Sequence, residues 1–465
     1  PKSDAPLANA RFILRSATNC TVFPPTKVQA VIIIISNKVL KYCASPLSIP
    51  LTSIFQTSLN SGIFPAFWKF ANVCPVHKGG SRSLVINYRP ISLLPTLSKI
   101  LEKVVAENIV DHISSVVCDN QHGFVPGRSC ETNLVTMLSS AYQALDDKVQ
   151  CDVIYTDFSK AFDTVSHELL MYKISKYGIS GNLYSWIQSY LTNRQQRVVL
   201  NGDYSSWKSV TSGVPQGSVL GPLFFNMFVN DIPLIFRHSH SLLFADDLKL
   251  FRTVRGPDDA QLLQADLDRL LTWSCSWRLA LNPTKCKVLT LTLKKQPVSH
   301  NYVLAQTQLD RVTNHKDLGI FIDSKLTFTA HIDYIVAKAN RMLGIFWRHC
   351  KNLHPKTKCV LYCSLVRPSL EFSSVSFNAI SATQDARIER VQRRFYRFLG
   401  NDADQFSLDS LRQRRQALDL IFLYKCVNSY FSCNLVSFFP LKISRPNLRN
   451  PNLFHVPNNR VSATK

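Results

Sequence analysis

Two adjacent carboxylates, Asp246 and Asp247, interrupt an apolar run that extends over residues 242–250. The pattern predicts two short strands joined by a turn, because Asp is favoured at bends between apolar strand segments. Two like charges at the end of a buried strand are costly unless a cation neutralises them. Carboxylate oxygens suit Mg²⁺, so we expect a hard divalent ion at this turn.

A third carboxylate, Asp157, follows a second apolar run at residues 153–155. If the two strand ends are neighbours, these three carboxylates and a backbone carbonyl could hold two Mg²⁺ ions about 3.5–4 Å apart. One ion would lower the pKa of an attacking 3′-hydroxyl, and the other would neutralise a leaving pyrophosphate. A lone Asp at a strand end is more often a cap or a surface ion pair, so the hypothesis depends on all three carboxylates.

The composition favours a polyanionic partner. Lys and Arg number 54 against 31 Asp and Glu, a net charge of +23. Such a surplus attracts nucleic acid, and the alternative is a basic surface kept for solubility. With 46% hydrophobic and 18% charged residues the chain is globular rather than disordered. Its 465 residues are too many for one core, so we expect two to four subdomains.

The thirteen cysteines are scattered, with no Cys-x-x-Cys spacing. This argues against a zinc ribbon or a disulfide scaffold and fits a reducing compartment. The longest strongly apolar run, residues 30–35, is far shorter than the roughly 20 residues of a membrane span. A secretory signal is not recognisable at the start. We therefore expect an intracellular protein, neither secreted nor bound to a membrane.

Periodicity predicts the elements that position these residues. Apolar residues at helical spacing predict a helix over residues 96–113. Asn201-Gly202 predicts a hairpin that joins residues 197–200 to residues 207–210. The other expected elements are strands at 151–158 and 287–293, helices at 160–176, 222–232 and 262–271, a largely helical basic region at 326–430, and a poorly ordered tail.

Several motifs occur in a fixed order. Residues 157–163 (DFSKAFD), 213–218 (GVPQGS) and 244–247 (FADD) resemble the palm motifs of reverse transcriptases of non-LTR (LINE-type) retrotransposons, and are most similar to the insect jockey-like group. Residues 87–94 and 121–129 resemble the finger motifs of that family. The resemblance continues through residues 281–286, 317–320, 367–372 and 412–415, and covers roughly residues 57–430.

The resemblance implies an α+β right-hand polymerase, with fingers, a palm containing a small antiparallel ferredoxin-like sheet, and a helical thumb. It implies an RNA-directed DNA polymerase that uses an RNA template, a DNA primer and deoxynucleoside triphosphates, and that acts in the nucleus. The expected regions are an altered N-terminal extension (1–56), fingers (57–150), the palm with finger insertions (151–325), a basic thumb and post-thumb region (326–430), and a tail (431–465).

By the same resemblance, Asp157 and Asp246 would be the principal ligands of two Mg²⁺ ions, with Mn²⁺ as an alternative metal. Asp247 would lie beside them, and the carbonyl of Phe158 would assist. Around the incoming nucleotide, Phe162 would exclude a 2′-hydroxyl, Gln216 would lie near the sugar, and Lys78 and Arg89 would reach the triphosphate. The plainer alternatives are a core position for Phe162, a simple turn at Gln216 and solvated charge at Lys78.

The resemblance also places residues near template and primer. Arg128 would lie in a loop near the template, and Lys285 close to the primer strand. Lys249 would screen the metal site or contact a primer phosphate.

Four arginines, Arg387, Arg390, Arg394 and Arg397, recur at spacings of three, four and three. Ile388, Val391, Phe395 and Phe398 recur at the same spacings, so we expect a basic ridge over an apolar underside. We hypothesise that the ridge follows a phosphate backbone; the alternative is an ordinary amphipathic helix with solvated arginines.

The chain also departs from the family. Residues 30–48 lack the Gly/Asp-rich pattern that family members carry upstream of the fingers. The endonuclease domain would precede Pro1, so we expect a fragment of a longer element. Two other interpretations remain: a catalytically decayed relic that only binds nucleic acid, and an intron-type reverse transcriptase.

Overall fold

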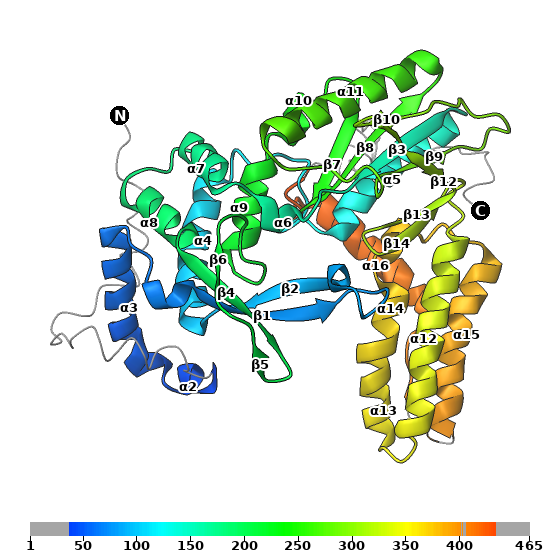
Figure 1. Cartoon of the computed structure of the whole chain (residues 1–465). Helices are drawn as coiled ribbons and strands as arrows, with labels where there is room; N and C mark the ends of the chain where they lie inside the picture. Colours follow the sequence, from blue (N-terminus) through cyan, green and yellow to red (C-terminus); the bar gives the residue numbers. More distant parts are fainter. Residues whose placement is uncertain (1–36, 401, 403–405, 434–465) are drawn as a thin grey trace, which may run out of the picture. The chain divides into compact units, whose positions relative to one another are not determined.

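The computed structural model describes residues 37–400, 402 and 406–433 (Figure 1). Packing divides the chain into two compact units, and each is assembled from three stretches. We call them the first unit (Pro1–Cys118, Phe158–Ile232 and Thr272–Leu281) and the second unit (Asp119–Asp157, Pro233–Leu271 and Asn282–Lys465). The expectations for residues 1–36 and 434–465 lie outside the described residues. The subdomain boundaries drawn from the sequence remain predictions, since the two units interleave along the chain.

The second unit contains a five-stranded sheet with the order β12-β9-β3-β8-β7. Its central strand is β3 (Gln150–Thr156), which is antiparallel to both β8 (Asp247–Val254) and β9 (Lys287–Leu291). The edge strands are β7 (His240–Phe244), antiparallel to β8, and β12 (Asp310–Val312), parallel to β9. Every residue of β3 is buried, including the polar Gln150, Asp152 and Thr156. Buried polar groups need partners, and Asp152 accepts hydrogen bonds from Thr290 Oγ1 and Tyr302 Oη.

Helix α5 (Cys130–Asp146) packs against β3, as Figure 1 shows. Its N-terminus is closed by a reciprocal capping box between Ser129 and Thr132. Leu134, Met137 and Ala141 of α5 are fully buried and join Val153 of β3 in the main core. This packing fixes the sheet that carries the acidic strand ends.

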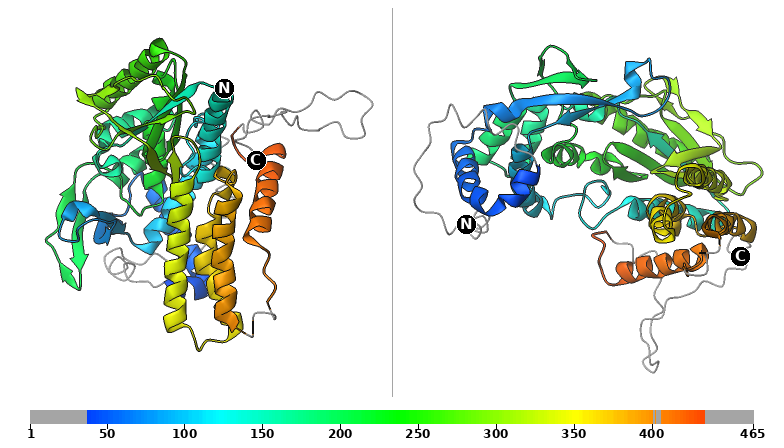
Figure 2. Two further views of the ribbon diagram at one scale, coloured as in Figure 1. Left: turned by 90° about the vertical axis from the view of Figure 1, so that its right-hand side faces the viewer. Right: turned by 90° about the horizontal axis from the view of Figure 1, so that it is seen from below.

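The C-terminal half of the second unit is mostly helical. A hairpin of β13 (Asn314–Asp317) and β14 (Ile320–Asp323) precedes α12 (Thr329–His349). Helix α12 packs along α15 (Ala382–Leu399), and both views of Figure 2 show these two helices side by side. The remaining elements are β10 (Val303–Leu304), β11 (Thr307–Gln308), α11 (Pro257–Ser276, which ends in the first unit), α13 (Pro355–Leu361), the π-helical turn η4 (Tyr362–Val366), α14 (Arg367–Glu371), η5 (Ser374–Ser376) and α16 (Leu411–Val427).

The first unit contains a second sheet, with the order β2-β1-β4-β5 and β6 paired to β4. Strand β1 (Phe70–His77) is antiparallel to β2 (Tyr88–Leu93) and parallel to β4 (Arg194–Leu200). Helix α9 (Leu220–Val229) is almost entirely buried. The other elements are α2 (Asn37–Tyr42), α3 (Ala44–Ser61), η2 (Ala66–Lys69), η3 (Val85–Asn87), α4 (Thr96–Ile113), α6 (Ala161–Thr164), α7 (His167–Lys176), α8 (Gly181–Leu191), β5 (Asp203–Tyr204), β6 (Lys208–Val210) and α10 (Ile232–Ile235, which begins in this unit).

Several predicted elements are confirmed. The helix expected over residues 96–113 is α4, and Asn201-Gly202 forms the expected turn with both residues at positive φ. The predicted second strand of that hairpin is wrong, because the turn joins β4 to β5, while residues 208–210 form β6 and pair with residues 194–196. The helix expected from Pro222 begins two residues earlier, at Leu220. Proline fits there because the first turn of a helix needs no N–H donor. Among the described helices, none is both long enough and apolar enough to cross a bilayer.

Candidate active site

The acidic turn joins β7 to β8 in the second unit. Phe244 pairs with Asp247 across it, leaving Ala245 and Asp246 at the bend. Ala245 has a φ of +56°, a left-handed conformation that is unfavourable for a residue with a side chain. The side-chain oxygen of Gln121 accepts hydrogen bonds from Ala245 N at 3.0 Å and Gly123 N at 2.8 Å. The 121–123 loop therefore holds the strained turn in place.

Asp157 lies beside this turn because of the strand register. Thr156, the last residue of β3, pairs with Leu248, and Thr156 Oγ1 donates to Leu248 O at 2.9 Å. Asp157 and Asp247 are the next residues on the two strands, so their backbones are neighbours. The main-chain oxygen of Asp157 accepts from Asn282 N at 2.8 Å, which attaches the 281–286 segment to the same strand end. The structure thus brings together the strand ends that the sequence singled out.

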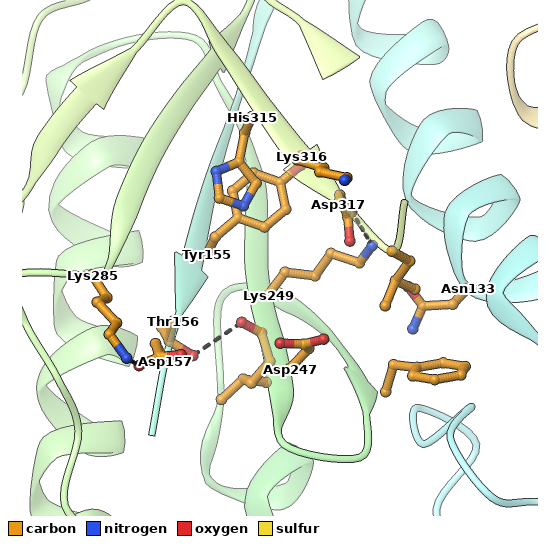
Figure 3. A pocket seen from close by; sticks show the side chains of 13 residues that line it. Asn133, Tyr155, Thr156, Asp157, Asp247, Lys249, Lys285, His315, Lys316 and Asp317 are labelled. Atoms are coloured by element: carbon orange, nitrogen blue, oxygen red, sulfur yellow. Dashed lines mark hydrogen bonds and ion pairs between the residues drawn. The ribbon is translucent and has the colours of Figure 1, made fainter. Parts of the chain in front are cut away.

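The electrostatics of the turn favour a cation. The pKa of Asp247 is raised to about 6, first by partial desolvation and then by repulsion from Asp246, Asp317 and Asp157. Its side chain remains accessible at the surface, so the group is crowded rather than enclosed. The Oδ2 atom of Asp157 is buried and accepts no hydrogen bond, and Lys285 Nζ lies 3.3 Å from it (Figure 3).

The donor set fits Mg²⁺ only in part. Among the described residues, no three acidic, histidine or cysteine side chains lie close enough to form a complete metal cluster. Mg²⁺ usually keeps several waters and binds through one or two carboxylates together with substrate phosphates. The crowded carboxylates match that mode of binding, in which the substrate completes the coordination.

Lys249 lies deeper than expected. Its side chain is only 5% exposed, and its ammonium forms an ion pair with the equally buried Asp317 of β13. Figure 3 shows both residues in a pocket with Tyr155 and His315, whose rings stack at 3.9 Å between centroids. This position does not support the expected contact with a primer phosphate. It agrees with the other expectation, a charge that screens the acidic turn, since Lys249 lowers the pKa of Asp247.

Arg128 is also more enclosed than a template-contacting loop residue should be. Its side chain is 5% exposed and donates to Gln121 O at 2.7 Å, to Asp119 at 3.0 Å and to Ser432 O at 3.0 Å. The expected template contact is therefore not supported by this position. Arg128 instead holds the loop whose Gln121 supports the acidic turn.

The first unit holds the residues expected around the nucleotide. Gln216 Nε2 donates to Asp163 Oδ1 at 2.9 Å, and both side chains line a cleft of about 410 Å³. Phe162 is half-buried, with its ring stacked on Phe225 at 4.4 Å. Phe158 is 4% exposed and pairs with Leu281 as an isolated bridge.

Lys78 and Arg89 are exposed near the same end of the β1–β2 hairpin. Arg89 pairs with Val76, and Lys78 follows the last strand pair, His77 with Tyr88. Burial raises the pKa of Asp163, and Lys78 is one of the groups that oppose this rise, so its charge acts on the acid that binds Gln216.

Comparison with known families connects these motifs. A family model described as "Reverse transcriptase (RNA-dependent DNA polymerase)" matches residues 76–344, more than half of the chain. The chain belongs to the reverse transcriptase family. This confirms the family recognised from the motifs, and the described helices and sheets agree with the expected α+β class.

Curated relatives of this reverse transcriptase include proteins of insect mobile elements. The "Probable RNA-directed DNA polymerase from transposon BS" of Drosophila melanogaster is 30% identical over 78% of this chain. That of transposon X-element from the same species is 27% identical over 82%, and the "RNA-directed DNA polymerase from mobile element jockey" of Drosophila funebris is 28% identical over 78%. The expected likeness to the jockey-like group is confirmed.

The reverse transcriptase chain spans less than half the length of these relatives, covering 42%, 44% and 41% of them. A solved structure with a partial likeness is "Structure of apo telomerase from Candida Tropicalis truncated from C-terminal domain". The match has a TM-score of 0.39 and 12% identity, and covers 59% of this chain and 58% of that chain.

The basic helix of the reverse transcriptase is α15. Its four predicted arginines line one groove with Val336, Asn340 and Trp347 of α12, with a volume of about 460 Å³. Arg387 is paired with Asp333, and Arg394 lies 5.7 Å from the Trp347 ring. Ile388, Val391 and Phe395 are buried as expected; Phe398 is only partly buried, and Leu399 takes the next core position.

Sequence reasoning missed three supports of the site. Gln121 and Gly123 were recognised as part of a motif but not as the contacts of the turn. The Asp163 contact of Gln216 was also missed. The sequence did offer a signal for the position of Lys249. Residues 247 and 249 of β8 point to the same face of the sheet, so Lys249 must lie near the carboxylates of the turn.

Proposed function

We propose that this chain is the polymerase part of a non-LTR retrotransposon reverse transcriptase, and that it adds deoxynucleotides to a primer 3′-end on an RNA template. The observation that carries the proposal is the junction of Asp157 with the Asp246–Asp247 turn at neighbouring strand ends. The names of the relatives, which describe RNA-directed DNA polymerases, support the choice of template and product.

In the second unit, the acidic residues would hold divalent metal, which the family generally uses. Asp157 and Asp246 would be the main ligands, Asp247 would assist, and the carbonyl of Phe158, next to Asp157 in the chain, would complete the set. Bound Mg²⁺ or Mn²⁺ would activate the primer hydroxyl and stabilise the leaving pyrophosphate. Lys285 already neutralises Asp157 at 3.3 Å, so its ammonium would move to primer phosphate when metal replaces it.

In the first unit, the exposed ends of Lys78 and Arg89 would bind the triphosphate through charge-assisted hydrogen bonds. Phe162 would exclude a 2′-hydroxyl from the sugar site, and its stacking on Phe225 would hold the ring in place. Gln216 would contact the sugar of the incoming nucleotide from the cleft that it lines.

The α15 groove would bind the phosphates of the template and primer. Its arginines concentrate positive charge along one helix of a chain whose net charge is +23. Binding would therefore weaken steeply as salt rises.

Primer extension tests this function directly. Purified chain should extend a DNA primer annealed to RNA when Mg²⁺ and the four deoxynucleotides are present. Chelation of the metal should stop extension, and added Mg²⁺ should restore it. Extension that continues in excess chelator would contradict the proposed metal dependence.

A second candidate, a nucleic-acid binder without catalysis, is favoured by the α15 groove alone, since that groove needs no metal. A gel shift of the same primer–template separates the two functions. Binding without extension under every divalent metal would support the second candidate and exclude the first.

A further inference from the structure

The side-chain amide of Gln216 has a defined partner in the first unit. Its Nε2 donates to Asp163 Oδ1 at 2.9 Å. An ionised carboxylate can only accept hydrogen bonds, so the nitrogen end of the amide must face Asp163. Among the described residues none donates to the opposite end, Gln216 Oε1, and the side chain lines the 410 Å³ cleft.

The separation between Asp163 and Gln216 is fixed by the backbone around them. Gly213 N donates to Val165 O and Val214 N donates to Phe162 O, both at 2.8 Å. Ser212 Oγ donates to Asp163 O at 3.0 Å. Gly213 has a φ of +82°, and a Cβ there would lie 2.6 Å from Asp163 O, so only glycine permits this approach.

A further bond holds the main chain of Gln216. Its carbonyl oxygen accepts from Ser92 N of β2 at 2.7 Å. The remaining freedom at this residue is the rotation of its side chain, and Asp163 restricts that rotation.

The carboxyl of Asp163 is subject to two opposing influences. Burial raises the pKa of its carboxyl, while the Gln216 amide, Lys160 and Lys78 lower it. The two lysines therefore oppose the cost of burying the carboxylate.

We propose that Asp163 is a positioning residue that fixes the Gln216 amide with Oε1 directed toward the nucleotide, where it accepts a hydrogen bond from the sugar 3′-hydroxyl. The inference rests on the proposed polymerase function and names the group by which the site selects its substrate. The four deoxynucleotides share the 3′-hydroxyl as their one hydroxyl donor, so a single oriented acceptor serves all of them.

The test compares dTTP with its 2′,3′-dideoxy analogue, which lacks that donor. Wild-type chain and the variants Asp163→Ala, Asp163→Asn and Gln216→Ala are assayed for kcat and KM in primer extension. Asp163→Ala should raise the KM for dTTP on the order of tenfold with little change in kcat, because it removes a hydrogen bond to a charged group. Its preference for dTTP over the dideoxy analogue should fall by a similar factor.

The conservative variant and the double variant sharpen the assignment. Asp163→Asn keeps an acceptor but also offers a donor, so it should retain part of the preference. The double variant Asp163→Ala, Gln216→Ala should discriminate no worse than Gln216→Ala alone, because both changes remove one interaction. If the two substitutions reduced the preference for dTTP independently, so that their effects multiplied in the double variant, the proposal would be overturned. An unchanged preference for dTTP in Asp163→Ala would also overturn it.

Asp111→Ala, at an exposed position of α4, is the matched control, and thermal melting checks that every variant folds. Equilibrium binding of dTTP and the dideoxy analogue, followed with fluorescently labelled nucleotides, gives a readout that needs no chemistry. If wild-type chain fails to extend primers but prefers dTTP in binding, and Asp163→Ala loses that preference, the polymerase proposal fails and the orientation proposal stands. Equal binding of the two nucleotides by wild-type chain overturns it.

Discussion

At the scale of single residues, the strongest constraint is the crowding of acidic side chains around Asp247. Partial desolvation and then three other aspartates raise the pKa of its carboxyl, and Lys249 opposes them from a buried ion pair with Asp317. A buried pair of this kind is not in itself stabilising, because desolvation offsets its attraction. The position of Lys249 behind the turn is better explained by its effect on Asp247, because its positive charge opposes the rise in the pKa of that carboxyl.

Removing the charge of Asp247 should relieve a pH-dependent destabilisation of the folded protein. Since its folded-state pKa is raised to about 6, the folded metal-free protein holds this proton more tightly than the unfolded chain does. Stability from this group is present at low pH and is lost as pH rises from about 4 to about 6. Asp247→Asn should therefore raise the Tm in EDTA more at pH 7.5 than at pH 5, measured by differential scanning fluorimetry.

Asp258→Asn provides the control, because Asp258 is an exposed aspartate in the first turn of α11. An Asp247→Asn gain that is the same at both pH values would contradict the raised pKa. Added Mg²⁺ should narrow the gap between wild-type and variant, because the cation relieves the same repulsion.

At the scale of elements, the acidic turn depends on its neighbouring loop. Gln121 bonds the strained Ala245, and Gly123 lies so close that an added Cβ would be 2.3 Å from Ala245 N. Arg128 then holds the loop through Gln121 O. The shape of the turn is therefore set by residues more than a hundred positions away in sequence.

Gly123→Ala should destabilise the fold by about 1–3 kcal/mol, the usual cost of forcing an atom into a packed site. It should also reduce primer extension, because the turn must shift to admit the methyl group. Chemical denaturation and extension assays measure the two effects.

Gly344→Ala is the matched control for this change. Gly344 lies in α12 with open space around the site of its missing Cβ, so the substitution should stabilise by roughly 0.5–1 kcal/mol. Equal stability of the two variants would show that the loop does not brace the turn.

The arginines of α15 predict a particular salt dependence. The association constant K for duplex binding should fall with salt, so a plot of log K against log salt has a negative slope. Replacing all four groove arginines with Gln should make this slope shallower by roughly 0.9 for each phosphate that is no longer neutralised. Binding titrations over a series of salt concentrations give the slope.

Arg393→Gln is the comparison variant, because Arg393 is exposed on the same helix but does not line the groove. If the fourfold replacement left the slope unchanged, the groove would not be part of the surface that binds nucleic acid.

Local features of this chain were predictable, and long-range pairs were not. The helix over residues 96–113 follows from its apolar spacing alone, and the acidic turn follows from charge within an apolar run. Asp163 and Gln216 are 53 residues apart, and Lys249 and Asp317 are 68 apart, so no local pattern pairs them. For the same reason the sequence left two roles open for Lys249, because a solvated lysine and a buried, paired lysine look alike in sequence.

At the scale of the whole molecule, the chain is a basic member of the reverse transcriptase family and consists of two units that interleave along the sequence. The proposed metal ligands Asp157, Asp246 and Asp247 belong to the second unit, and the residues proposed to bind nucleotide belong to the first. Metal binding and nucleotide binding are thus assigned to different side chains, and substitution can separate them.

The most direct test is RNA-templated primer extension by wild-type chain and Asp246→Ala, with a gel shift of the same primer–template and Asp258→Ala as the control. The account predicts extension by wild-type and control, a loss on the order of 10³-fold or more in Asp246→Ala, and unchanged gel shifts in all three. Full activity of a folded Asp246→Ala would contradict the assignment of the acidic turn as the catalytic centre.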